Sequence, residues 1–245
     1  GDLFSHLSAR TKAGLNGFTE ATAAMLLAEL SLALLHLHAA GYVHRDVKVE
    51  NIMLDSCGHV KLVDFGLACP IAESAASAGI PGGASDTSDI GQPMTPTGSL
   101  LYMSPELLDE KVGGRFTDWW AVGVVAYELL TGRSPWSSLT NKKQIRVEIR
   151  GGHPACLPAH LSGAAQDFVE GLLERDCRRR LGTWSDAEVL WWNDTLVVLW
   201  VPGGNPNPIG LLRLRRRKDH WGDIVDLFRK GDRTSGPRRE IPTGV

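Results

Sequence analysis

The sequence predicts a mainly α fold with short β-hairpins, that is, an α+β domain in which helices dominate. Two stretches, residues 21–40 and 118–130, are apolar on nearly every side of a helix, and short strand-like pieces follow the first of them. A helix that is apolar all round is buried, so we expect these two helices to form the core. The chain has 245 residues, 43% of them hydrophobic, enough for one sizeable core or two small ones.

The first of these helices carries a start signal and a stop signal. Thr19 is a suitable N-cap, and Gly41 stands where a left-handed C-terminal residue is wanted. The helix contains His36 and His38, and no third metal ligand is evident beside them. We therefore expect both histidines to be packing or surface residues.

Short strands come next along the chain. We expect them over residues 42–43, 52–54 and 60–63, with a turn at 56–58 between the last two. The tract that follows, residues 70–94, is rich in Gly, Ser, Ala and Pro. Such a composition cannot bury a core, so we expect a flexible insertion there.

The second half of the chain predicts two further helices and one segment without a structural interpretation. The helix over 118–130 is closed by Gly132, and another is expected over 162–174. The 13 residues of 118–130 are too few to cross a bilayer, and we find no apolar run that is long enough. Residues 184–217 are Trp-rich and then Gly/Asn/Pro-rich with no clear period, so a real insertion and a translated intron both stay open.

Charge and cysteine content exclude several classes of protein. The formal net charge is −2, and the one basic run, residues 213–218, is local and typical of a solvated or disordered stretch, so we expect no nucleic-acid partner. Four widely spaced cysteines show no metal-ligand pattern, and no signal peptide is visible. We expect reduced thiols in a protein of the cytoplasm or nucleus.

Three polar residues near the predicted strands have the spacing that phosphoryl transfer requires. Asp46 and Asn51 are five residues apart, and Asp64 follows 18 residues after Asp46, at the end of a strand. This reaction needs one carboxylate to accept the hydroxyl proton. It also needs a second carboxylate and an amide to hold the magnesium ions that bridge the phosphates.

Several short motifs occur together and in order. His44-Arg45-Asp46 and Asp64-Phe65-Gly66 resemble the signature set of protein kinases. Ser104-Pro105-Glu106 stands where kinases have Ala-Pro-Glu, Asp118 opens a stretch similar to their next buried helix, and Arg180-Leu181-Gly182 is similar to a later arginine motif. The sequence is therefore identified as resembling a protein kinase, which leaves an unrelated helical protein as a very weak alternative.

Longer segments resemble the AGC group of serine/threonine kinases. They are GDLFSHL, NIMLDSCGHVKLVDFGLA and DWWAVGVVAYELLTGRSPW, closest to the ribosomal-protein kinase and cyclic-nucleotide-dependent kinase branches. The resemblance covers residues 1–183 and implies the large, C-terminal lobe of the kinase fold. It resumes over 218–245, which implies the end of the domain and the start of an AGC-type tail, and 184–217 match nothing in the family.

The resemblance implies a role for each polar residue of the site, with ATP and Mg²⁺ as cofactors. Asp46 would be the catalytic base, and Lys48 would steady the transferred phosphate. The nucleotide and its metal ions would be held by Asp2, Glu50, Asn51, Met53 and Asp64, with Asn51 and Asp64 as the metal ligands. Structural roles fall to the His44–Phe65 contact, Gly66, Asp118 as the anchor of the catalytic loop, and a buried Glu106–Arg180 ion pair.

The substrates implied are proteins with basic residues upstream of the phosphorylated Ser or Thr. Asp2, Glu50 and Glu128 match positions at which basophilic AGC kinases hold arginines, and carboxylates bind arginine in a bidentate way. Each of the three could equally be a solvated surface acid. Ser99 would supply the hydroxyl expected near the base.

Regulation by an upstream kinase is implied at Thr95, with Arg45 pairing with the phosphate. Thr95 lies three residues before Gly98, as in the family. The sequence departs from the family in two ways: Pro96 replaces an aromatic residue, and Cys69 occupies the place of a lysine.

The glycine-rich loop, strand lysine and helix glutamate of kinases are not found in the chain. Residues 1–4 already correspond to the segment after the hinge, so we expect the ATP-covering small lobe to be absent here and ATP affinity to be weak. Two interpretations stay open. One is a fragment of an active serine/threonine kinase, and the other is a non-catalytic, lobe-only scaffold or pseudokinase that binds protein partners.

Overall fold

The computed structural model describes residues 1–71, 92–93, 96–109, 112–151, 156–182, 189–192 and 195–198. The chain divides into two units, Gly1–Leu214 and Arg215–Val245, and every described residue belongs to the first. Several predicted features lie outside the described residues: Thr95, most of the 70–94 tract, the basic run at 213–218 and the 218–245 tail. Helices dominate the described part, and its strands are short and paired in twos, as the sequence predicts.

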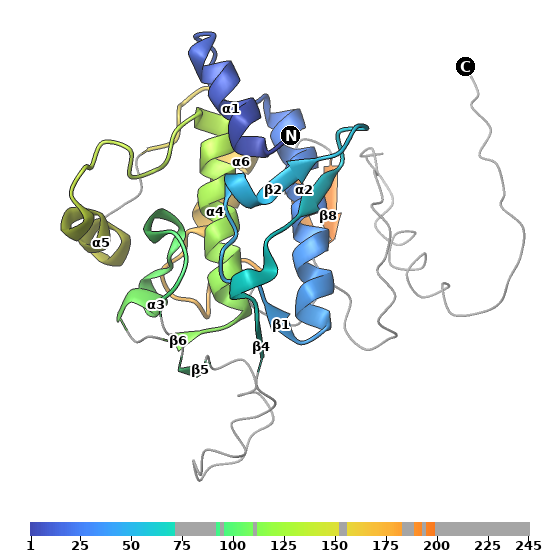
Figure 1. Cartoon of the computed structure of the whole chain (residues 1–245). Helices are drawn as coiled ribbons and strands as arrows, with labels where there is room; N and C mark the ends of the chain where they lie inside the picture. Colours follow the sequence, from blue (N-terminus) through green and yellow to red (C-terminus); the bar gives the residue numbers. More distant parts are fainter. Residues whose placement is uncertain are drawn as a thin grey trace, which may run out of the picture. The chain divides into compact units, whose positions relative to one another are not determined.

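Helix α4, Arg115–Thr131, is the centre of the core (Figure 1). Every residue from Phe116 to Leu130 is buried, which accounts for the all-round apolar pattern. The helix begins three residues earlier than the sequence predicts. It ends as predicted at Gly132, which is in the left-handed region at φ 76° and donates its N–H to the carbonyl of Glu128.

Helix α2, Glu20–Ala39, packs beside α4. The Thr19 hydroxyl accepts the N–H of Thr22 at 3.3 Å, so the predicted N-cap is confirmed. Contrary to the prediction that no apolar run is long enough, α2 could cross a membrane by length and composition alone. Half of its apolar window is buried inside the fold, as in a core helix of a globular domain, and the described residues show no clear membrane span.

Two small ribbons position the loops that carry the polar residues. Strand β1, Tyr42–Val43, pairs antiparallel with β4, Cys69–Pro70. Strand β2, Ile52–Leu54, pairs antiparallel with β3, Val60–Leu62. Strand β3 is one residue shorter than predicted, and β2 has the predicted bounds. Because the β2–β3 ribbon lies along the chain between the two strands of the β1–β4 ribbon, residues 44–51 and 63–68 both run between the two ribbons and lie close together (Figure 1).

The remaining elements surround this core. The predicted helix at 162–174 is α6, Gly163–Leu172, with Ser162 as its N-cap. The structure adds helices that the sequence does not predict: α1 (Leu3–Lys12), α3 (Pro105–Asp109) and α5 (Lys142–Gly151). It also adds short 3₁₀ turns, η1 (Val49–Asn51), η2 (Phe65–Leu67) and η4 (Leu100–Tyr102), and the pairs β5 (Gln92–Pro93) with β6 (Val112–Gly113) and β7 (Val189–Trp192) with β8 (Thr195–Val198).

A fully buried arginine joins the end of the described core to α3. Arg180 is 0% exposed, and its two terminal nitrogens donate to the two carboxylate oxygens of Glu106 at 2.7 and 2.9 Å. The guanidinium also donates to the carbonyls of Phe116 and Glu174 and lies 5.1 Å from the ring of Trp120. This is the pair that the resemblance implies, and the bidentate contact with the further carbonyl acceptors offsets part of the cost of burying the two charges.

Candidate active site

A carboxylate of the core helix α4 fixes the backbone at the start of the loop 44–51. Asp118 of α4 is 1% exposed and accepts the backbone N–H of His44 on Oδ2 and that of Arg45 on Oδ1, each at 2.9 Å. These bonds hold Arg45 at φ 67°, a left-handed conformation that a non-glycine residue rarely adopts. This geometry fits the predicted role of Asp118 as the anchor of the catalytic loop.

A second contact to Asp118 comes from α2 and was missed by sequence reasoning. Nε2 of His38 lies 2.8 Å from Oδ2 of Asp118, and the imidazole meets the ring of Trp119 edge-on at 5.9 Å. His38 is buried, whereas His36 is exposed. A sequence contains no local signal for such a pair, because 80 residues separate its members.

His44 links the 44–51 loop to the segment that carries Asp64. Its Nδ1 accepts the backbone N–H of Asp46 at 3.3 Å, so Nε2 must carry the proton of the neutral ring. That Nε2 donates to the carbonyl of Val63 at 3.1 Å. The ring also meets Phe65 edge-on at 5.1 Å, which is the contact implied for these two residues.

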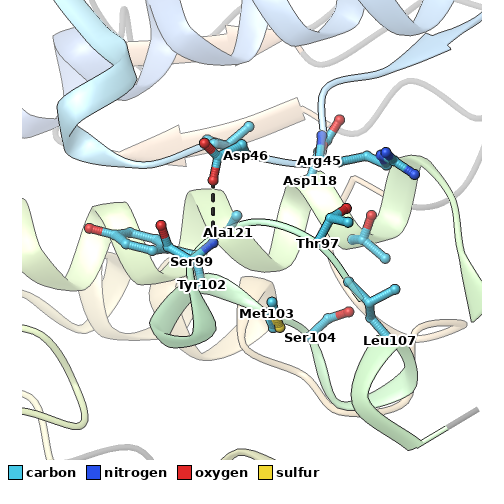
Figure 2. A pocket seen from close by; sticks show the side chains of 12 residues that line it. Arg45, Asp46, Thr97, Ser99, Tyr102, Met103, Ser104, Leu107, Asp118 and Ala121 are labelled. Carbon is cyan, nitrogen blue, oxygen red and sulfur yellow. Dashed lines mark hydrogen bonds between the residues drawn. The ribbon is translucent and has the colours of Figure 1, made fainter. Parts of the chain in front are cut away.

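The carboxylate of Asp46 takes part in three hydrogen bonds, as many as that of Asp118. Its Oδ2 accepts from Nζ of Lys48 at 2.5 Å and from Nδ2 of Asn51 at 3.0 Å. Its Oδ1 accepts the backbone N–H of Ser99 at 3.3 Å, across the gap between two segments (Figure 2). Asp46 is only 7% exposed, so a nearly dry carboxylate is held in one orientation beside a lysine ammonium.

Asn51 and Asp64 lie on neighbouring backbone. The N–H of Val63 donates to the carbonyl of Asn51 at 3.0 Å, which ties the end of β3 to η1. Asn51 uses Nδ2 for both of its bonds to Asp46, which leaves its Oδ1 as a potential metal ligand. Asp64 is exposed, and its Oδ1 accepts the N–H of Gly66, which leaves Oδ2 open.

Mg²⁺ suits this pair of side chains. It is usually held by one or two carboxylates together with phosphate oxygens and water, not by a cage of protein ligands. The Asp64 carboxylate and the Asn51 amide oxygen fit that requirement. Among the described residues no cluster of three His, Cys, Asp or Glu side chains could hold a metal ion.

A hollow lies beside Asp46, between the 44–51 loop, α4 and the segment 97–107 (Figure 2). Its wall combines polar and apolar side chains. Ser104, which stands where the kinase motif has alanine, lines it with an Oγ that has no partner among the described residues. The lining residues are Arg45, Asp46, Val47, Thr97, Ser99, Tyr102, Met103, Ser104, Leu107, Thr117, Asp118 and Ala121.

A buried acid lies under the same segment. Glu128 is 6% exposed and accepts a 2.7 Å hydrogen bond from the hydroxyl of Tyr102. Burial raises the pKa of Glu128 to about 7; the Tyr102 hydrogen bond opposes this rise, and the charge of Glu50 adds to it. Tyr102 is a second residue that sequence reasoning missed.

Three predicted residues, Asp2, Met53 and Glu50, lie at the edge of the site. Asp2 caps α1 by accepting the N–H and the hydroxyl of Ser5 at 2.7 and 2.8 Å, and these bonds lower its pKa. Asp2 also forms an isolated antiparallel bridge with Met53, which places the two predicted nucleotide contacts side by side. Met53 is partly buried, and Glu50 is exposed in the middle of η1.

Comparison with known proteins decides the family. The sequence profile described as "Protein kinase domain" matches residues 1–191. The chain belongs to the protein kinase family.

The chain is also similar to individual protein kinases. Ribosomal protein S6 kinase beta of Caenorhabditis elegans is 38% identical over 191 residues, covering 77% of this chain and 30% of the relative. RAC-beta serine/threonine-protein kinase of Rattus norvegicus is 37% identical over 186 residues, covering 74% and 33%. Developmentally-regulated protein kinase 1 of Dictyostelium discoideum is 36% identical over 198 residues, covering 79% and 24%.

These relatives confirm the resemblance to AGC-group protein kinases. The chain spans only about a quarter to a third of the length of each relative. The family match ends at residue 191, so it extends over 184–191, and the prediction that the whole segment 184–217 matches nothing in the family is wrong for these residues.

Of the two residues of the predicted regulatory contact, the structure describes Arg45. Arg45 donates from Nε to the carbonyl of Leu67 at 2.6 Å and lines the hollow together with Thr97. Cys69 lies in β4 and is partly buried. Thr95 lies outside the described residues, so its pairing with Arg45 stays a prediction.

Proposed function

We propose that this protein transfers the γ-phosphoryl group of ATP to serine and threonine hydroxyls of protein substrates. The observation that carries the proposal is the coordination of Asp46. A buried carboxylate whose Oδ2 accepts hydrogen bonds from Lys48 and Asn51 is oriented to accept the proton of a substrate hydroxyl beside the hollow. The Lys48 ammonium, 3.5 Å from the hydroxyl of Ser99, would steady the transferred phosphate.

ATP and Mg²⁺ would bind on the side of Asp64. The open oxygens of Asp64 and Asn51 would hold the metal, which neutralises the charge of the phosphates when bound. Met53, beside Asp2, would pack under the adenine. Phe65 is 51% exposed on that side and keeps its contact with His44.

The substrate preference proposed is for basic residues upstream of the acceptor hydroxyl. Glu50 is exposed and influences the charge of buried Glu128, so the two carboxylates lie near one another. A guanidinium between them would form charge-assisted hydrogen bonds and relieve their mutual repulsion. Asp2 is a further candidate, although both of its oxygens already accept from Ser5.

Regulation and location are proposed from the sequence. An upstream kinase would phosphorylate Thr95, and Arg45 would bind the phosphate and order the segment. Residues 1–183 would be the large lobe of the domain, with 218–245 as its end and the start of an AGC-type tail. Four free cysteines favour the cytoplasm or nucleus as its location, which fluorescence microscopy of the tagged protein would test.

The test is a phosphate-transfer assay on the protein produced from its complete transcript, with a peptide containing arginines upstream of one serine. Asp46→Asn should lower kcat by about 100-fold or more and change the nucleotide Kd less than about twofold. Asp167→Asn, an exposed acid on α6, is the matched control and should change neither. Transfer by Asp46→Asn at a near-normal rate, or no transfer by the wild-type protein, would refute the proposal. The second result would favour the non-catalytic, partner-binding alternative.

A further inference from the structure

Helix α5 is held firmly on the domain by one of its faces. Ile145 and Ile149 are buried, and Arg150 pairs with Asp109 and donates to the carbonyl of Leu108, both on α3. From the other side, Arg175 donates to the carbonyls of Ile149 and Glu148 at 3.3 and 3.4 Å. The outward face of α5 is therefore presented on a fixed support (Figure 1).

That outward face is basic and has one exposed apolar side chain at its edge. Lys142, Lys143 and Arg146 are exposed, and among the described residues none has an ion pair or a side-chain hydrogen bond. Val147, four residues after Lys143, is 61% exposed, more than any other large exposed hydrophobic residue of the described part. Spacings of three and four residues bring these four side chains together on one surface.

The stability of the helix does not explain the two lysines. Lys142 and Lys143 lie in the first turn, where the positive end of the helix dipole disfavours cations by a few tenths of a kcal/mol or more. The chain as a whole has a net charge of −2, so the concentration of positive charge is local to this face. Residues that weaken their own helix while remaining unpaired are candidates for a binding role.

We propose that the face Lys142–Lys143–Arg146–Val147 docks an acidic segment of a protein partner. Carboxylates of the partner would pair with the three cations, and an apolar side chain beside these carboxylates would cover Val147. Helix α5 adjoins η4, the turn that follows Ser99, so a docked partner would lie beside the site that contains Asp46. The inference concerns binding alone and does not depend on phosphate transfer.

A protein segment fits this face better than a nucleic acid. The patch is one short helix with three cations that have no ion pair within the described part of the chain, whereas nucleic-acid sites neutralise a longer series of phosphates. An exposed valine among the cations gains nothing from a phosphate backbone but gains from an apolar side chain.

The test measures fluorescence anisotropy of a short labelled peptide in which glutamates flank one central leucine, titrated with the 245-residue chain at near-physiological salt. The variant Lys142→Glu/Lys143→Glu/Arg146→Glu should raise the peptide Kd about tenfold or more. The control Lys12→Glu/Lys61→Glu/Arg179→Glu makes the same change of net charge at exposed positions elsewhere and should alter Kd less than about twofold.

Val147→Ser separates the apolar part from the charges. It should weaken binding of the leucine peptide about threefold and leave binding of a serine-centred peptide unchanged. Absence of saturable binding by the wild-type chain, or equal weakening by the control variant, would overturn the proposal. So would tighter binding of a single-stranded RNA that is lost in the α5 variant, because the ligand would then be a nucleic acid.

Discussion

Nε2 of His38 lies 2.8 Å from Oδ2 of Asp118, although the two residues are 80 positions apart in the chain. The same Oδ2 accepts the backbone N–H of His44. The buried carboxylate of Asp118 thus joins α2 and α4 to the loop 44–51, which contains Asp46 and ends at Asn51. The orientation of the proposed base depends on the packing of the two core helices.

His38→Phe tests this connection. The change keeps an aromatic ring but removes the donor to Asp118, which leaves a buried acceptor less well satisfied. We expect the free energy of unfolding in urea to fall by about 1–3 kcal/mol. His36→Phe, on the exposed side of the same helix, should cost less than about 0.5 kcal/mol. Equal effects of the two changes would contradict a specific role of His38.

The Glu106–Arg180 pair allows a double-mutant cycle. Arg180→Met leaves the Glu106 carboxylate buried and unpaired, so we expect a loss of about 3–5 kcal/mol in the free energy of unfolding. Glu106→Leu should cost a similar amount because it isolates the guanidinium. The double variant, measured by the same urea titration, should be more stable than either single variant. If the two losses simply add, the residues are not coupled.

Local signals predicted the elements that have local causes. The Thr19 cap, the stop at Gly132 and the apolar runs of α2 and α4 follow from nearest-neighbour chemistry. Helix α5 was missed because only Ile145 and Ile149 of its ten residues are buried, so its apolar period is short and its composition polar.

The candidate site shows the same division. Motif spacing placed Asp46, Asn51 and Asp64 in one region, and the structure brings their loops together. The contacts of His38 with Asp118 and of Tyr102 with Glu128 were not predicted, because each joins residues that are far apart in the sequence and meet only through tertiary packing. A pKa that burial has raised, such as that of Glu128, likewise has no sequence signature.

Glu128 should make stability depend on pH. Its ordinary pKa is 4.5, and its folded pKa is about 7 because of burial. Between these values the folded protein keeps a proton that the unfolded chain has released, so raising the pH favours unfolding. The contribution of Glu128 is therefore fully present below pH 4.5 and lost by about pH 7, with a difference of about 3 kcal/mol at most.

Urea unfolding of the wild type and Glu128→Gln across this range checks the sign. Because glutamine stays neutral, the variant should gain stability relative to the wild type as pH rises from 4.5 to 7. Tyr102→Phe removes a hydrogen bond that lowers the pKa of Glu128. In this variant the loss of stability with rising pH should therefore continue to a higher pH than in the wild type. A constant difference between the wild type and Glu128→Gln would show that Glu128 titrates normally.

Gly98 approaches the 44–51 loop more closely than any side chain would allow. Its φ is 93°, and a Cβ atom there would lie 2.8 Å from the carbonyl oxygen of Arg45 and 3.0 Å from Oδ1 of Asp46. Gly98→Ala must therefore displace either the loop or the segment that carries Ser99. Because a misplacement of about 1 Å can cost 100-fold in rate, we expect kcat for phosphate transfer to fall by about that factor.

Gly41→Ala is the matched control for this change. Gly41 has a similar φ of 82°, but a Cβ there would meet no atom within 4 Å. Both substitutions should lose about 1–2 kcal/mol of stability from the left-handed backbone. Only Gly98→Ala should impair transfer beyond about twofold, because only there does the added methyl group press on Asp46. If Gly41→Ala reduces kcat as much as Gly98→Ala at matched stability, the loss reflects global destabilisation, and the tight fit of Gly98 against Asp46 does not position the base.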